Sequence, residues 1–196
     1  MSYRSKNTQL ILSIKAALVL LFFTCACSKT PFDLTHAPQR GSGSGDILVQ
    51  FTDFDCQSCK AVQPSLHALR ISHPQVVLAF KSFPLVDSEA GIRKHLIARC
   101  VFEQDKESFW LYYDLAFSDN PGPAADDRQT AEMMNLDSQA MAQCIASPTT
   151  RQAVLRDQQE GQTSGVVGTP TFFFKGSRKE GLMSAKDMRQ FVANLE

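Results

Sequence analysis

The chain has 196 residues, of which 43% are hydrophobic and 20% are charged, and its formal net charge is zero. This length suits one domain with a core of its own. The balanced charge gives no indication of nucleic-acid binding, and the hydrophobic content is that of an ordinary globular protein.

Residues 1–27 have the pattern of an export signal peptide. Arg4 and Lys6 give a positive start, and a mainly apolar stretch follows over residues 10–23. Its uninterrupted part, residues 16–23, is too short to cross a bilayer as a permanent helix. A retained membrane anchor is the alternative.

The end of this segment, Ala26-Cys27, resembles the lipobox of bacterial lipoproteins, in which the cysteine is lipidated after cleavage. Thr24 and Cys25 depart from that pattern, so simple cleavage is the alternative to lipidation of Cys27. In both cases we expect the protein in the cell envelope, on the extracytoplasmic (periplasmic) side and lipid-anchored if Cys27 is modified. Disulfides persist in that compartment.

Residues 28–46 are polar and are broken by Pro31, Pro38 and a glycine–serine run at 41–45. This composition predicts a flexible linker. We therefore expect the folded domain to span residues 47–196.

Strand and helix patterns alternate through this domain. Hydrophobic periodicity predicts strands at 47–54, 75–82 and 171–175, with the end of an edge strand at 181–183. It predicts helices at 60–71, 88–104, 107–117, 126–134, 138–146, 148–162 and 184–195. The order indicates an α/β fold, a central mixed sheet flanked by helices, with a helical insertion at about 87–163.

Local signals support several of these helices. Asp137, Ser147 and Ser184 are suitable N-cap residues, and Asp187 completes a capping box with Ser184. Pro64 predicts a kink in the first helix, because proline removes a backbone donor there.

Cys56 and Cys59 lie three residues apart where a predicted strand gives way to a helix. At a helix N-terminus unpaired N–H groups favour a thiolate, the species that exchanges disulfides. The spacing alone leaves open a redox pair, half of a zinc site or an inert structural bridge.

Pro170 directly precedes an all-apolar strand. A cis Thr169–Pro170 bond would turn the chain sharply and present the Thr169 backbone to whatever lies opposite. An ordinary trans bond is the alternative.

Together these two motifs resemble the thioredoxin superfamily and, within it, the DsbA branch. The resemblance covers roughly residues 46–196 and rests on three segments: 51–59, 80–85 and 165–173. DsbA-like proteins insert a helical domain in the long interval between the C-x-x-C pair and the proline loop, where this chain has its block of predicted helices.

The resemblance implies a role for each site residue. Cys56 would be the exposed nucleophile and Cys59 the buried resolving cysteine. The Thr169 backbone would pair with an extended substrate segment, and Pro170 would keep metals away from the dithiol. No cofactor and no resident metal is implied.

The resemblance also implies partners. Exported proteins with thiols or disulfides would be the substrates, and a membrane oxidase of the DsbB or VKOR type would regenerate the disulfide. A reductase or isomerase that uses the reduced pair is the first alternative. A non-enzymatic metal-binding or docking lipoprotein is the second.

Two departures from the family pattern concern redox tuning. Gln50 stands where the family often carries an acid and cannot titrate; a water, Asp53 or Asp55 could substitute. Gln57-Ser58 replaces the frequent Pro-His or Pro-Tyr, so no imidazole favours the thiolate. We therefore expect a less extreme oxidant than the best-known members.

Cys100 and Cys144 lie on predicted helical faces in the insertion. An even cysteine count in an oxidising compartment favours a structural disulfide between them. Two buried free thiols and a four-cysteine zinc site are the alternatives. The histidines have no metal-ligand spacing: His36, His67, His73 and His95.

Overall fold

A computed structural model describes residues 31–41, 45–86 and 88–193 of the chain. The predicted export signal, its lipidation site Cys27 and part of the glycine–serine run lie outside the described residues. Within the described ranges, no helix is both long and apolar enough to cross a membrane.

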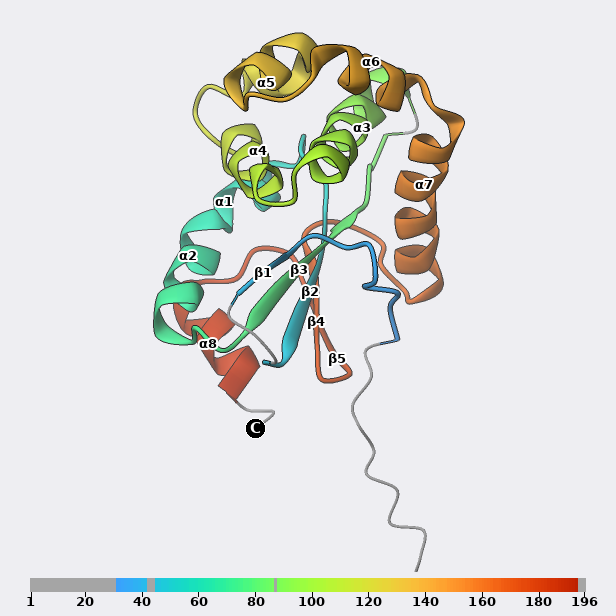
Figure 1. Cartoon of the computed structure of the whole chain (residues 1–196). Coiled ribbons are helices and arrows are strands. Elements are labelled where there is room, and N and C mark those ends of the chain that lie inside the picture. Colours follow the sequence, from blue (N-terminus) through green and yellow to red (C-terminus); the bar gives the residue numbers. More distant parts are fainter. Residues whose placement is uncertain (1–30, 42–44, 87, 194–196) are drawn as a thin grey trace, which may run out of the picture.

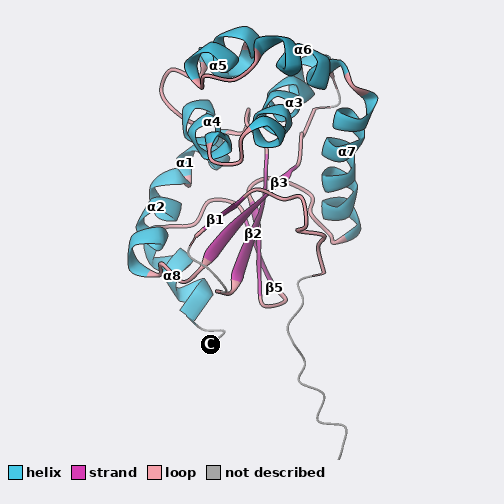
Figure 2. Cartoon of the chain, viewed as in Figure 1, coloured by secondary structure: helices cyan, strands magenta, loops and turns pink. Residues whose placement is uncertain are grey.

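A mixed five-stranded sheet forms the centre of the fold, in the order β1-β3-β2-β4-β5 (Figure 2). The strands are β1 (Gln39–Arg40), β2 (Ile47–Thr52), β3 (Val77–Ser82), β4 (Thr171–Phe174) and β5 (Ser177–Glu180). β2 and β3 are parallel, and the other neighbouring pairs are antiparallel. The predicted mixed sheet is confirmed.

Helices cover the sheet on both faces and at one end (Figure 1). α2 packs against α8, α7 lies along β3 on the other side, and α3 to α6 gather beyond the carboxyl ends of β2 and β3. The helices are α1 (Gln57–Ala61), α2 (Gln63–Ser72), α3 (Glu89–Gln104), α4 (Ser108–Ala116), the 3₁₀ helix η1 (Gly122–Ala125), α5 (Asp127–Met133), α6 (Ser138–Ala146), α7 (Pro148–Thr163) and α8 (Ala185–Ala193).

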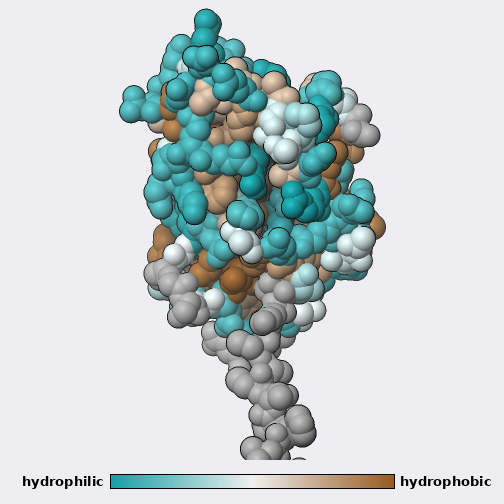
Figure 3. Space-filling model, turned by 45° about the vertical axis from the view of Figure 1, so that its right-hand side comes forward, coloured by the Kyte–Doolittle hydropathy of each residue, from teal (hydrophilic) through white to brown (hydrophobic). Residues whose placement is uncertain are grey.

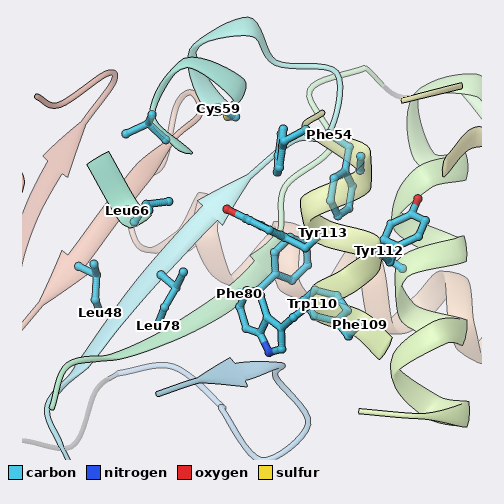
Figure 4. Close-up of a cluster of buried hydrophobic side chains, with 14 of the residues drawn as sticks. Leu48, Phe54, Cys59, Leu66, Leu78, Phe80, Phe109, Trp110, Tyr112 and Tyr113 are labelled. Atoms are coloured by element: carbon cyan, nitrogen blue, oxygen red, sulfur yellow. The ribbon is translucent and has the colours of Figure 1, made fainter. Parts of the chain in front are cut away.

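The larger core lies between the sheet and helices α2, α3, α4 and α8. Side chains alternate along β2, so Leu48 faces this core together with Leu78 and Phe80 of β3. Four aromatic residues of α4 pack in the core below the helical turn that carries Cys59 (Figure 4): Phe109, Trp110, Tyr112 and Tyr113. The aromatic residues of this sequence run thus form the buried part of α4.

The smaller core lies on the opposite face of the sheet, under α7. Phe51 and Phe83 pack there so closely on α7 that a Cβ at Gly161 would lie only 2.8–2.9 Å from their rings. Glycine is therefore required for this approach. The outward side of α7 is mainly hydrophilic (Figure 3).

A buried lysine joins three segments at this face. Lys81 Nζ lies 2.8 Å from Asp157, 2.7 Å from Glu160 and 2.6 Å from the carbonyl of Asp33. The ammonium has a partner for each of its three protons, as a buried charge requires.

The predicted linker 28–46 is wrong for residues 31–41. Phe32 and Ala37 are buried, and β1 pairs with β3. Phe32, Leu34 and Ala37 are scattered apolar residues in a polar segment and leave no periodic pattern, so the sequence does not reveal that they pack on the sheet.

The predicted edge strand also ends in a different place. β5 spans Ser177–Glu180, and residues 181–183 follow it. Gly176 and Gly181 have φ values of +79° and +77°, which place a turn at each end of the strand. The first helix divides into α1 and α2 at Val62, with Pro64 in the first turn of α2, as the predicted kink requires.

Candidate active site

Cys56 caps the helix that follows β2. Its backbone is extended (φ −83°, ψ 118°), and its sulfur accepts a hydrogen bond from the Cys59 N–H at 3.2 Å. The side chain is half-buried, so the sulfur is open to a partner. The sulfur thus has a backbone N–H donor at the start of the helix.

Cys59 lies one turn further on and is fully buried. Burial, together with the neighbouring Cys56, raises the pKa of the Cys59 thiol to about 12, against opposing hydrogen bonds from Thr169 and Thr52. The free Cys59 is therefore protonated at neutral pH, and the two sulfurs differ in exposure.

The Thr169–Pro170 loop faces this pair. The bond is cis, and the Cys56 thiol donates to the Thr169 carbonyl at 3.2 Å. The structure thus brings together two motifs that are far apart in the sequence. Val167, at 82% exposure, lies on the solvent side of the same loop.

Arg178 of β5 holds the start of this loop. Its guanidinium donates to the carbonyl of Gly165 at 2.8 Å, and Gly165 has a φ of +82°. A Cβ at Gly165 would meet that guanidinium, which would have to move, and the positive backbone angle itself favours glycine.

Gln50 is fully buried and accepts a hydrogen bond from the Tyr113 hydroxyl at 2.9 Å. Gln57 is exposed and Ser58 is half-buried. Among the described residues no side-chain hydrogen bond joins Ser58 to Cys56, and the Cys56 sulfur accepts from the Cys59 N–H.

Asp53 and Asp55, the suggested substitutes for the missing acid, have other partners. The Asp53 carboxylate accepts from the N–H groups of Asp55 and Leu85 at 2.9 and 2.7 Å, and Asp55 pairs with Lys94. Neither carboxylate forms a hydrogen bond to Cys59 within the described structure, and the suggested substitution is not supported.

His95 is a buried neighbour of Asp53 that the sequence did not reveal. It is fully buried on α3, with Nε2 at 3.5 Å from Asp53 and its ring 5.0 Å from that of Phe54. Burial raises the pKa of Asp53, but the nearby His95 and the hydrogen bonds from the two N–H groups outweigh it and lower the pKa below its usual value. The position of His95 three residues after the buried Ile92 was the available signal.

Cys100 of α3 and Cys144 of α6 form a disulfide, with their Cα atoms 5.8 Å apart. It ties together two helices of the region between β3 and β4. The bond removes both sulfurs from the suggested four-cysteine zinc site, and no group of three or more metal-binding side chains occurs in the described part of the chain.

The chain is similar to known proteins over this folded region. A family model described as thioredoxin matches residues 42–194. Two curated Na⁺/H⁺ antiporters also match: NhaA 3 of Salinispora tropica is 28% identical over 155 residues, and NhaA 1 of Salinispora arenicola is 26% identical over 159 residues. Each alignment covers 77% of this chain, but the chain spans only 23% of the length of these relatives.

Several solved structures have a similar fold. The thiol-disulfide exchange protein alpha-DsbA2 of Wolbachia pipientis has a TM-score of 0.70 and 24% identity, covering 84% of this chain and 89% of that one. The catalytic domain of Proteus mirabilis ScsC has a TM-score of 0.69 and 18% identity, covering 84% and 91%. Oxidised BdbD of Bacillus subtilis has a TM-score of 0.70 and 16% identity, covering 83% and 94%. At these identities the likeness establishes the fold.

Proposed function

Because the chain belongs to the thioredoxin family and has a DsbA-like fold, we propose that it is a thiol–disulfide oxidoreductase that acts on proteins outside the cytoplasm. The redox centre is the Cys56–Cys59 pair. One observation carries this function: the half-buried Cys56 sulfur accepts an N–H and lies 3.2 Å from the Thr169 carbonyl, whereas Cys59 is buried beneath it.

The exchange proceeds in two steps in the oxidative direction. A substrate thiolate attacks the Cys56 sulfur of the disulfide, a mixed disulfide forms, and Cys59 leaves as a thiolate that takes up a proton. A second substrate thiolate then attacks the substrate sulfur of the mixed disulfide, and Cys56 leaves. The substrate gains a disulfide and loses two electrons, which remain in the Cys56–Cys59 dithiol.

The loop holds the substrate during these steps. The Thr169 carbonyl accepts a backbone N–H from an extended substrate segment, which keeps the substrate sulfur near Cys56. Pro170 has no N–H to offer the substrate, and its carbonyl accepts from the Gly181 N–H at 2.7 Å.

The substrates are exported proteins with free thiols. A membrane oxidase of the DsbB or VKOR type accepts the two electrons and restores the disulfide. The export pattern of residues 1–27 and the Cys100–Cys144 disulfide support an extracytoplasmic location, because disulfides persist in oxidising compartments. Lipidation of Cys27 would hold the domain at the membrane surface.

Equilibration of the Cys56–Cys59 pair with glutathione tests the direction of exchange. An oxidase is expected to have a reduction potential between about −120 and −200 mV, whereas a value below about −250 mV would assign a reductase. The measurement should follow Cys56 and Cys59 by mass after alkylation, so that the Cys100–Cys144 disulfide serves as an internal control.

Trapping of substrates tests the site itself. Cys59→Ser should accumulate mixed disulfides between Cys56 and unfolded proteins that carry disulfides, because Cys56 attacks the substrate disulfide, one substrate thiol leaves, and no second sulfur of the pair can release the substrate. If Cys59→Ser accumulates none while its fold is intact, Cys56 is not the exchanging sulfur and the proposed function is wrong.

A further inference from the structure

One end of the Gln50 side chain has no partner. Its Oε1 accepts from Tyr113, but its Nε2 is buried and forms no hydrogen bond to any described residue. A buried amide without a partner costs free energy, so the position of Gln50 needs an explanation.

The orientation of this amide follows from its neighbours. Gln63 donates from Nε2 to the carbonyl of Cys59 at 2.8 Å, and a carbonyl can only accept, so this end of Gln63 is the NH₂ group. The same nitrogen lies 2.9 Å from the Tyr113 hydroxyl, which therefore accepts from Gln63.

The Tyr113 proton then has one destination, Gln50 Oε1 at 2.9 Å. In Figure 4 the Tyr113 hydroxyl points toward β2, the strand that carries Gln50. Burial raises the pKa of Tyr113, so the hydroxyl stays neutral and keeps its proton. The hydrogen-bond chain from Gln63 through Tyr113 leaves the Gln50 NH₂ group as a free donor.

This donor lies on the side of β2 that faces Cys59. Leu48, Gln50 and Thr52 alternate onto one face of the strand, and Leu48 and Cys59 belong to the same core cluster. The Thr52 hydroxyl, together with that of Thr169, acts on the Cys59 thiol and lowers its pKa against burial. Neither hydroxyl has another partner among the described residues. The two hydroxyls therefore belong to the surroundings of the Cys59 sulfur, and the Gln50 donor lies on the same face of β2 as Thr52.

We infer that Gln63, Tyr113 and Gln50 form a positioning network that directs the Gln50 N–H, with the Thr52 and Thr169 hydroxyls, at the Cys59 sulfur as negative charge develops on it. This inference rests on the proposed function. When the substrate thiolate attacks Cys56, the Cys56–Cys59 bond breaks and its electron pair moves to Cys59. Neutral donors stabilise that thiolate without transferring a proton, and an acid at residue 50 is not needed.

The experiment compares rate with equilibrium in the full-length protein. The rate is that at which dithiothreitol reduces the Cys56–Cys59 disulfide, and the equilibrium constant is that with glutathione. Gln50→Leu and Tyr113→Phe should each slow reduction about tenfold, as the loss of one hydrogen bond to a charged group predicts. The equilibrium constant should stay within about twofold, because Cys59 is a neutral thiol in the reduced end state.

Tyr112→Phe is the matched control. Tyr112 is the adjacent, equally buried tyrosine of α4, and its hydroxyl donates to the carbonyls of Lys94 and Ala124, away from Cys59. Its variant should lose stability and leave the reduction rate unchanged. Gln50→Glu should add an inflection to the pH profile of the rate that the wild type lacks, since a titrating group now faces the sulfur.

Several outcomes would overturn the inference. Unchanged reduction rates in Gln50→Leu and Tyr113→Phe would show that the Gln50 amide does not act on Cys59. If the rate of reduction by dithiothreitol and the equilibrium constant with glutathione change by the same factor, Gln50 and Tyr113 have only a structural role. If Gln50→Leu does not fold, Tyr113→Phe decides alone, because it removes only one oxygen. The dithiothreitol reaction needs no protein substrate, so a failure of the proposed function would appear separately, as absence of exchange with protein thiols.

Discussion

The two cysteine pairs of this chain are brought together in different ways. Cys100 and Cys144 are 44 residues apart in sequence and form a disulfide between α3 and α6, whereas Cys56 and Cys59 share one helical turn and are free. Cys59 and Cys100 are both fully buried. Burial alone therefore does not distinguish a reactive cysteine from a structural one.

The surroundings of the sulfurs make the difference. The Cys56 sulfur has an N–H donor and a backbone carbonyl within 3.2 Å, supplied by Cys59 and by the cis-proline loop. Cys100 lies in a core of apolar side chains such as Ile97 and Val101. A sulfur that is to change charge needs polar neighbours, and a sulfur that stays in a disulfide does not.

The largest expected effect comes from removal of the reactive sulfur. Cys56→Ser should lower the rate of disulfide transfer to a reduced dithiol peptide by at least about a thousandfold, because a hydroxyl cannot form the mixed disulfide. Its unfolding midpoint, measured in parallel, should stay close to that of the wild type. Full activity in Cys56→Ser would place the chemistry elsewhere.

Removal of the Cys100–Cys144 disulfide should lower stability and leave the rate of disulfide transfer unchanged. In Cys100→Ala/Cys144→Ala the free energy of unfolding should fall by about 4 kcal/mol, since the disulfide closes a loop of 44 residues in the unfolded chain. Urea titration measures this loss. At low denaturant the rate of disulfide transfer by the folded fraction should match that of the wild type. A lower rate would show that the Cys100–Cys144 disulfide also contributes to disulfide transfer.

Asp53→Asn tests the polar contacts of the segment between β2 and Cys56. An asparagine amide would place its NH₂ group against one of the two N–H donors that the carboxylate accepts, so stability at pH 7 should fall by about 2 kcal/mol. Because the pKa of Asp53 is lowered in the folded state, its contribution is complete above about pH 4 and is lost as the pH falls through the folded-state value. Unfolding curves of both proteins should therefore converge in acid; a constant difference would contradict the assignment.

The smallest expected effect is at Arg178. Arg178→Ala removes the donor to the Gly165 carbonyl, and since the side chain is partly exposed the transfer rate should fall only about twofold. Lys179→Ala, at the exposed neighbouring position, is the control. Equal rates for the two variants would show that Arg178 does not position the loop.

Sequence reasoning reached the features that depend on local chemistry. Asp137 and Ser147 cap α6 and α7, and Ser184 pairs with Asp187 at the start of α8, because a cap requires only residues close in sequence. The C-x-x-C pair and the proline loop were also visible, since each has a distinctive short pattern.

Features that depend on long-range packing were missed. Gln50 contacts Tyr113, which lies 63 positions later in the chain, and Asp53 contacts His95, which lies 42 positions later. No local sequence pattern encodes such contacts. The same holds for Phe32, whose burial depends on a sheet face formed by strands that follow it in sequence. From the sequence alone such residues have the pattern of ordinary strand, helix or linker positions, and only the three-dimensional structure shows their contacts.

The contact between Cys56 and the Thr169 carbonyl has a consequence for the order of binding and release. A thiol can donate to that carbonyl, as it does at 3.2 Å, but a disulfide sulfur has no proton to donate. A substrate N–H therefore has the carbonyl to itself when the pair is oxidised and competes with the Cys56 thiol for it when the pair is reduced. The loop would thus hold a substrate loosely once the substrate has been oxidised, and product would leave without any movement of the backbone. A Thr169 carbonyl ¹³C chemical shift that is the same in both redox states would contradict this expectation.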